Sequence, residues 1–343
     1  LTSKSTKFYL SRVGSRTFWT AGRRYSISGP TPYKRRFAEG ATIVPRSCWF
    51  VRITSSPLGF DPNMPRVETD PRAIEAAKPP YKNLRLDGIV EARFLYATLL
   101  STDMIPFGHL PYRLVVLPIM PVAHAYAVVD AEMAREKGFI HLAQWVDRCQ
   151  QEWAARRRSK ASAMSVVARL GHRRGLEGQD PQTSYVVVYN ASGTNLASCV
   201  VENKAISLQA DGQELQAQGF VADSKTYFYQ SGRKAEVDYL SAVLNAPIVN
   251  QLIKPMQSRG LWGARDIGKK VLELPIPEFK PRDRQHADLA RLGRHCADVV
   301  SDALKNNDLP QTAPIGRLRS MVRDMLSDEL SDIDRLVRAL LGC

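Results

Sequence analysis

The order of hydrophobic and polar residues along the chain predicts both helices and strands. In the first half, apolar and β-branched runs predict strands over 113–119 and 125–130. A similar run at 41–53 contains a proline, which favours an edge strand or two short strands. The apolar run 90–100 instead predicts a buried helix that begins near Gly88. A stripe at helical spacing predicts a second helix, through Leu142, Val146, Cys149 and Trp153.

A polar segment at 175–185, rich in Gly, Gln, Asp and Pro, predicts a linker. Beyond it, short apolar runs predict strands at 185–189, 197–201, 219–222 and 225–229. A helical pattern follows at 236–253, then a basic loop at 258–270 and a strand-like run at 271–277. Two amphipathic helices are predicted in the last 60 residues, one through Leu289, Leu292, Cys296 and Val299, and one through Leu318, Val322, Met325, Leu330, Ile333 and Leu340.

These elements predict an α+β fold, in which a mixed β-rich region with inserted helices precedes a C-terminal pair of amphipathic helices. Composition divides the 343 residues into a basic arm or linker at 1–40, the β-rich region at 41–281 and a helical region at 282–343. The segment at 175–185 offers a further boundary within the β-rich region.

The chain carries a strong positive charge, concentrated at one end. It has 48 Lys and Arg against 34 Asp and Glu, a formal net charge of +14. Residues 1–60 hold eleven basic residues against Glu39 alone, whereas residues 282–343 hold ten of each sign. Such a surplus favours an acidic partner, with nucleic acid ahead of an anionic membrane surface. The longest apolar stretch, 114–129, is interrupted by prolines and a histidine, so no membrane span is predicted.

Aromatic residues alternate with the cations of the N-terminal arm, at Phe8, Tyr9, Phe18, Trp19, Tyr25, Tyr33 and Phe37. Cations neutralise phosphates and rings stack on bases, so this segment is predicted to contact nucleic acid, with candidate phosphate ligands at Lys34, Arg35 and Arg36. The alternative is an arm whose rings pack on the body of the protein while its charges stay solvated.

The sequence contains no established catalytic motif. A Walker loop, HExxH, GxSxG and a Gly-rich dinucleotide turn are absent, and the six histidines show no metal-ligand spacing. One enzyme hypothesis stays open, a metal-dependent nuclease that uses Asp266, Glu278 and Lys280. The prolines around Glu278 disfavour it, because the nuclease motif needs a central strand. Five cysteines without paired spacing indicate a reducing compartment, and we expect a cytoplasmic protein.

Short segments follow one another in an order that carries a family resemblance. They are GATIVPR at 40–46, LDGIVE at 86–91, YNASGT at 189–194, YL at 239–240, VLNAP at 243–247, SRG at 258–260, ARDI at 264–267, LPIP at 274–277 and RLV at 335–337. Together they resemble the C-terminal target-recognition region of adenine-N6 DNA methyltransferases of restriction–modification systems, the Taq-type specificity domain. The resemblance covers most of 30–340, and type I specificity subunits show a looser version of it.

The resemblance implies a protein that reads double-stranded DNA, in which loops enter a groove and basic residues hold phosphates. In this family a catalytic domain binds S-adenosylmethionine through a Gly-rich loop and holds a flipped adenine with Asn-Pro-Pro-Tyr. Neither motif is present, since Lys78-Pro-Pro-Tyr81 has a lysine where a hydrogen-bond acceptor is needed. We therefore expect no cofactor in this chain, which begins at Leu1. The S-adenosylmethionine-binding half is expected in a fused or separate methyltransferase partner, in a bacterial or archaeal cytoplasm.

The basic loop at 258–270 is the strongest candidate for groove contact on its residues alone. Arg259 and Arg265 offer forked donors that suit guanine or phosphate, and Lys269 and Lys270 add phosphate contacts. The alternative is a solvated loop in which Asp266 pairs with Arg265. Second-tier phosphate candidates are Arg156, Arg157, Arg158, Arg173 and Arg174. A remaining alternative for the whole chain is a non-catalytic scaffold whose C-terminal helices bind a protein partner.

Overall fold

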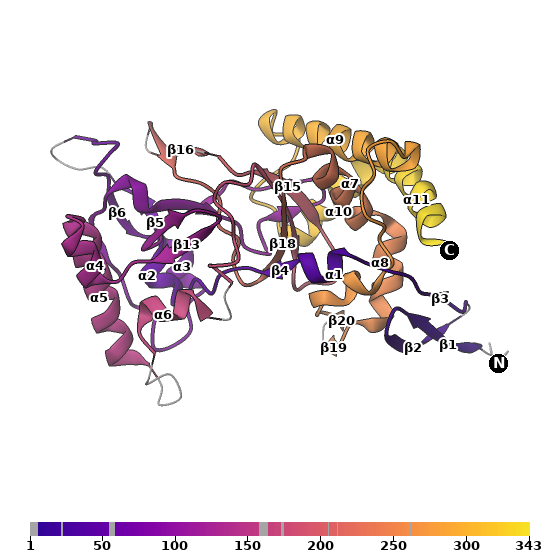
Figure 1. The fold of residues 1–343 in the computed structure, drawn as a ribbon, viewed down its shortest axis with the longest axis horizontal. Helices are drawn as coiled ribbons and strands as arrows, with labels where there is room; N and C mark the ends of the chain where they lie inside the picture. Colours follow the sequence, from indigo (N-terminus) through magenta and orange to yellow (C-terminus); the bar gives the residue numbers. More distant parts are fainter. Residues whose placement is uncertain are drawn as a thin grey trace.

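The computed structural model describes residues 6–21, 23–54, 59–157, 164–172, 175–204, 206–210, 212–260 and 263–343. Helices and strands are mixed along the chain, so the predicted α+β fold is confirmed. Figure 1 shows two lobes on either side of a central sheet. Each lobe has its own hydrophobic core. In the described part of the chain, no helix is long and apolar enough to cross a membrane.

The first lobe is built around an antiparallel sheet in the order β7 (Asp87–Ile89), β6 (Arg66–Thr69), β5 (Phe50–Ile53), β11 (Arg113–Val116) and β8 (Leu95–Thr98). Its helices are α2 (Arg46–Trp49), α3 (Pro71–Glu75), α4 (Ala131–Glu136), α5 (Ile140–Arg156) and α6 (Val166–Leu170). Two hairpins complete the described strands of this lobe, β12 (Ile119–Val122) with β13 (Ala125–Val128), and β16 (Ile206–Ala210) with β17 (Gln213–Ala217). A third hairpin, β9 (Met104–Ile105) with β10 (Gly108–His109), lies between the lobes, since Met104 belongs to the first core and Ile105 to the second.

The central sheet separates the two cores and contributes to both. Its order is β15 (Ser198–Glu202), β14 (Tyr185–Asn190), β18 (Thr226–Ser231) and β4 (Ala38–Glu39). Because side chains alternate across a strand, Val186 and Val188 of β14 enter the first core, whereas Val187 and Tyr189 enter the second. Both faces are therefore buried, which explains the unbroken apolar run in β14.

The second lobe consists mainly of helices, which are α7 (Lys234–Asn245), α8 (Pro247–Ile253), α9 (Arg284–Lys305), α10 (Ile315–Met325) and α11 (Ser327–Leu341). The apolar stripes of α9, α10 and α11 are buried in the second core, through Leu289, Leu292, Cys296, Leu318, Val322, Leu330 and Ile333. These stripes are thus covered by the chain itself, which removes the feature on which the scaffold alternative rested.

The N-terminal arm is a folded part of the second lobe. Its sheet has the order β2 (Arg16–Ala21), β1 (Phe8–Val13) and β3 (Ser26–Ile27), and α1 (Tyr33–Arg36) follows. The rings of Tyr33 and Phe37 are buried in the second core, as the alternative for this arm predicted. Phe8 and Trp19 remain exposed, at 63% and 65%. The arm is therefore attached to the body at its C-terminal end and also through the hairpin, where Val13 is buried in the second core and Ser15 donates to Glu273.

Arg319 of α10 connects the two lobes. Its Nε donates to the carbonyl oxygen of Met104 at 2.9 Å, and its Nη2 donates to that of Ser101 at 2.7 Å. Burial, together with the neighbouring Arg323, lowers the pKa of Arg319 to about 10, so the side chain stays charged at neutral pH. Charged donors strengthen these bonds to the backbone and fix the position of the first lobe against α10.

Several predicted elements are corrected by the structure. Residues 90–100 form a 3-10 turn, η1 (Ala92–Phe94), and strand β8 instead of the predicted helix. The sequence does not indicate the strand, because the run is buried on both sides and therefore lacks the alternation of apolar and polar residues. In 41–53, α2 precedes β5, and β5 lies inside its sheet and not at an edge. The predicted strand at 271–277 is wrong, since Gly268–Glu273 is the 3-10 helix η5.

The predicted strand at 219–222 is also wrong, because Phe220 forms only an isolated bridge to Ala97 there. Most of the other elements agree with the sequence pattern, with two breaks. The helix at 142–153 and the strands within 113–130 are confirmed, as are those at 185–189, 197–201 and 225–229. The helix at 236–253 divides at Pro247, which begins α8, and the last stripe divides at Leu326 into α10 and α11. A 3-10 helix, η4 (Lys254–Met256), and a short hairpin of β19 (Arg259–Gly260) with β20 (Gly263–Ala264) follow α8.

Candidate nucleic-acid interface

A basic hollow lies where the two lobes meet the central sheet. It has a volume of about 550 Å³, and its lining comes from α1, β4, α6, η5 and the turn before β18. The titratable residues of the lining are Arg35, Glu39, Arg169, His172 and Lys269. Three full cations therefore face one carboxylate, and we call this site the basic hollow.

The floor of the basic hollow is formed by backbone segments in very close contact. A Cβ atom on Gly40 would lie 2.3 Å from the carbonyl oxygen of Ala222, and one on Gly175 would lie 2.4 Å from that of Gly40. The buried side chain of Gln179 joins the same segments, since its Nε2 donates to the carbonyl oxygen of Gly175 at 2.8 Å and its Oε1 accepts from the amide of Ala222 at 2.8 Å. The floor is thus held at a distance that only glycine permits.

The cations of the basic hollow are available to an anion. Among the residues that the structure describes, neither Arg35 nor Arg169 forms an ion pair, and the ammonium group of Lys269 lies 5.9 Å from the ring centroid of Tyr227. Unpaired guanidinium groups on a concave surface suit phosphate oxygens, which they can hold through two donors at once. The arrangement is chemically suited to a phosphate group.

A second, more apolar pocket adjoins the basic hollow and shares Arg169 and Ser224 with it. Its volume is about 500 Å³. The uncharged part of its lining is Val44, Pro45, Ser47, Ala73, Ala76, Ala77, Tyr81 and Trp153, and the basic part adds Arg46, Lys78 and Lys225. We call this the aromatic pocket.

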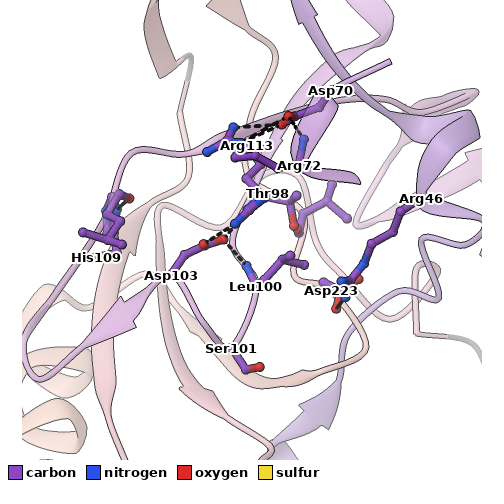
Figure 2. A network of polar contacts seen from close by, with 12 residues as sticks. Arg46, Asp70, Arg72, Thr98, Leu100, Ser101, Asp103, His109, Arg113 and Asp223 are labelled. Atoms are coloured by element: carbon purple, nitrogen blue, oxygen red, sulfur yellow. Dashed lines mark hydrogen bonds and ion pairs between the residues drawn. The ribbon is translucent and has the colours of Figure 1, made fainter. Parts of the chain in front are cut away.

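Arg46, which lines the aromatic pocket, contacts the buried carboxylate of Asp223. Figure 2 shows Arg46 reaching Asp223, near the pair formed by Asp103 and Arg113. Arg46 Nη2 lies 3.7 Å from Asp223 Oδ1, and the other oxygen, Oδ2, is buried without a hydrogen-bond partner among the described residues. Burial raises the pKa of Asp223 to about 6, and the attraction of Arg46 offsets this only in part.

The raised pKa predicts a stability effect at Asp223. In the unfolded chain the carboxyl ionises near its usual value of 3.8, so between that pH and 6 the folded state holds the proton more tightly. The contribution of this carboxyl group to the free energy of unfolding is fully present below pH 3.8. It is lost as the pH rises through 6, and the free energy of unfolding falls by roughly 3 kcal/mol. Asp223→Asn is expected to remove this loss. Urea unfolding at pH 4.5 and 7.5 measures it, and an equal pH dependence in both proteins would contradict it.

Comparisons with known proteins give a likeness in structure and none in sequence. No protein-family model and no curated protein matches this chain. The chain is similar in structure to part of MmeI, a type IIL restriction-modification enzyme solved in complex with DNA, with a TM-score of 0.53 at 8% sequence identity. The two share a fold. The alignment covers 99% of this chain and 39% of MmeI, so this chain spans well under half of the MmeI chain.

The structure brings two of the predicted phosphate ligands together and holds others in ion pairs. Arg35 and Lys269 both line the basic hollow. Lys34 Nζ instead lies 2.8 Å from a carboxylate oxygen of Glu273. Burial alone would raise the pKa of Glu273, but hydrogen bonds from Lys34 and Ser15 hold that pKa below its usual range. Arg36 pairs with Glu278, and Lys270 is buried and pairs with Asp266. Lys34, Arg36 and Lys270 thus have carboxylate partners within the chain.

The basic loop at 258–270, which we call the reading loop, has Arg265 exposed on its surface. Its side chain is exposed without an ion pair among the described residues, while its carbonyl oxygen accepts from the amide of Gly193 at 2.7 Å. The alternative in which Asp266 pairs with Arg265 is wrong, because Asp266 contacts Lys270. Arg259 belongs to β19, but its side chain lies outside the described residues. Of the two arginines of this loop, the structure therefore describes only the side chain of Arg265, which is exposed.

The second-tier candidates lie at the end of α5 and near α6. Arg156 pairs with Glu152, and Arg157 donates to the carbonyl oxygen of Met164 at 3.3 Å. Arg158, Arg173 and Arg174 lie outside the described residues. Sequence reasoning missed Arg169, Lys78 and Lys225, because their neighbours in the interface are distant in sequence, although Arg169 stands only four residues before Arg173.

The nuclease hypothesis finds no support in the geometry. Asp266 is neutralised by Lys270, and Glu278 by Arg36. The backbone amide of Lys280 donates to His286 Nδ1 at 3.0 Å, and its side chain is exposed. In the described ranges, no three His, Cys, Asp or Glu side chains form a group that could hold a metal ion. The three residues do not form the arrangement that metal-dependent cleavage needs.

Proposed function

We propose that this chain is the DNA target-recognition part of a restriction–modification enzyme. It binds double-stranded DNA and performs no methyl transfer of its own. Methylation of adenine N6, with S-adenosylmethionine, belongs to a methyltransferase domain or subunit that works with it in a bacterial or archaeal cytoplasm. The proposal rests first on the basic hollow, where Arg35, Arg169 and Lys269 converge without ion pairs in the described structure.

Two further observations support the proposal. The fold is shared with part of MmeI, which was solved in complex with DNA. The reading loop at 258–270 is continuous with η5, so the exposed Arg265 stands four residues before Lys269 in the basic hollow. In the proposed complex, the hollow holds the phosphate backbone and Arg265 reads a base edge in the adjoining groove.

The proposed roles of Arg265 and Lys269 are tested by comparing single alanine variants. Arg265→Ala is expected to lower the preference for a sequence selected from a randomised duplex library, by roughly 1–3 kcal/mol. Lys269→Ala is expected to weaken selected and random duplexes alike, because a phosphate contact carries no sequence information. Dissociation constants at several salt concentrations measure both effects. Failure of the unmodified chain to bind duplex DNA would refute the function, and equal losses for both variants would refute the roles.

A further inference from the structure

The aromatic pocket differs in kind from the basic hollow beside it. One wall is formed by Tyr81 and Trp153, whose ring centroids are 6.3 Å apart with an interplanar angle of 19°. Three alanines, Ala73, Ala76 and Ala77, leave the space in front of this wall open. A volume of about 500 Å³ falls within the range of small-molecule sites, which is roughly 300–1,000 Å³. The pocket therefore has the size of a small-molecule site and a stacked pair of aromatic rings on one side, of which Tyr81 is the more exposed.

Cations line the same pocket. Lys78 and Lys225 are exposed, and Arg169 is half-buried where the pocket adjoins the basic hollow. None of the three forms an ion pair among the described residues. Arg46, by contrast, is engaged by Asp223. The pocket thus combines aromatic rings with three cations, none of which forms an ion pair among the described residues.

We propose that the aromatic pocket binds a single nucleotide, with its base against Tyr81 and Trp153 and its phosphate on Lys78, Lys225 and Arg169. Base stacking on aromatic rings is worth roughly 1–3 kcal/mol per base and tolerates any base. This inference rests on the proposed function in one respect. DNA that lies in the basic hollow passes Arg169 and Ser224, which also line the pocket, so a nucleotide turned out of the duplex enters it directly.

The same chemistry fits two sources, an unpaired nucleotide of bound DNA and a free mononucleotide. Turning a paired base out of a duplex costs a few kcal/mol, and the cost is smallest for a nucleotide that has no partner. A duplex with one unpaired nucleotide is therefore expected to bind roughly tenfold more tightly than its fully paired counterpart.

The test uses the whole chain, both duplexes and the free nucleotides dAMP, dGMP, dCMP and dTMP. Ala77→Phe fills the pocket and is expected to abolish the preference for the unpaired duplex and any binding of free nucleotides. Lys78→Gln is expected to weaken both roughly tenfold, the lower end for loss of one hydrogen bond to a charged group. Lys82→Gln is the matched control, since Lys82 is exposed, lies four residues further on and does not line the pocket. Thermal unfolding shows whether each variant is folded. If Ala77→Phe does not fold, Lys78→Gln alone tests the pocket.

The outcomes separate the pocket from the proposed function. A preference for the unpaired duplex that Ala77→Phe or Lys78→Gln removes assigns the pocket to DNA. Binding of free nucleotides that the same variants remove, without such a preference, assigns it to mononucleotides and holds even if no duplex binds. Duplex binding with neither effect overturns the pocket and leaves the proposed function intact. Effects that persist in both variants also overturn the pocket, because the nucleotide then binds elsewhere.

Discussion

Replacing Arg35, Arg169 and Lys269 together by glutamine is expected to weaken duplex DNA binding by roughly two orders of magnitude at low salt. The three side chains converge on the basic hollow and have no acidic partner in the described structure, so their charge is free to neutralise phosphate. Each lost phosphate contact also lowers the slope of log affinity against log salt by about 1. Titrations of the triple variant between low and physiological salt measure both quantities.

A second triple variant controls for the loss of overall charge. Arg284, Arg291 and Lys305 lie on α9, with side chains 97%, 70% and 70% exposed, and none of them lines the hollow. Their replacement by glutamine removes the same three charges and is expected to change DNA affinity only slightly. Equal losses from the two triple variants would mean that net charge, and not the basic hollow, attracts the DNA.

Gly40→Ala is expected to lower the free energy of unfolding by about 3 kcal/mol, near the upper end of overpacking effects. The new Cβ would lie 2.3 Å from the carbonyl oxygen of Ala222, and neither backbone segment can yield without disturbing the bonds of Gln179. Since the same contact forms the floor of the basic hollow, DNA affinity is expected to fall as well. Urea unfolding and DNA titration of one preparation measure the two effects.

Gly232→Ala is the matched control for this substitution. A Cβ on Gly232 meets no atom within 4 Å, and its backbone is outside the left-handed region. Its unfolding free energy is expected to change by less than about 1 kcal/mol, and in the stabilising direction, because alanine restricts the unfolded chain. If both substitutions destabilise equally, the close approach at Gly40 does not determine the stability of the floor.

The sequence predicts those helices and strands that bury one face and leave the opposite face in solvent. The stripe through Leu142 and Trp153 gives α5 because its opposite face is solvated. The run 90–100 is misread because it is surrounded by the first core, where neither helical nor strand alternation is visible. Pro247 is a local signal for a break, and the structure uses it as the first residue of α8.

The candidate site is predictable only where its residues are clustered in sequence. Arg35 and Lys269 stand in basic segments and could be proposed directly, whereas Arg169 stands on α6 of the first lobe and only the fold brings it to them. Charge alone also cannot separate Lys269 from Lys270. The fold distinguishes them, since Lys270 is buried and pairs with Asp266, whereas Lys269 is exposed.

The central sheet has a consequence for how the molecule moves and unfolds. Alternate residues of β14 belong to different cores, so neither lobe can lose its packing without exposing the wall that supports the other. The chain is therefore expected to unfold as one cooperative unit, and a cut at 175–185 would leave neither piece with a complete core. Bound DNA would for the same reason meet two lobes of fixed spacing, so recognition depends on deformation of the duplex more than on closure of the protein.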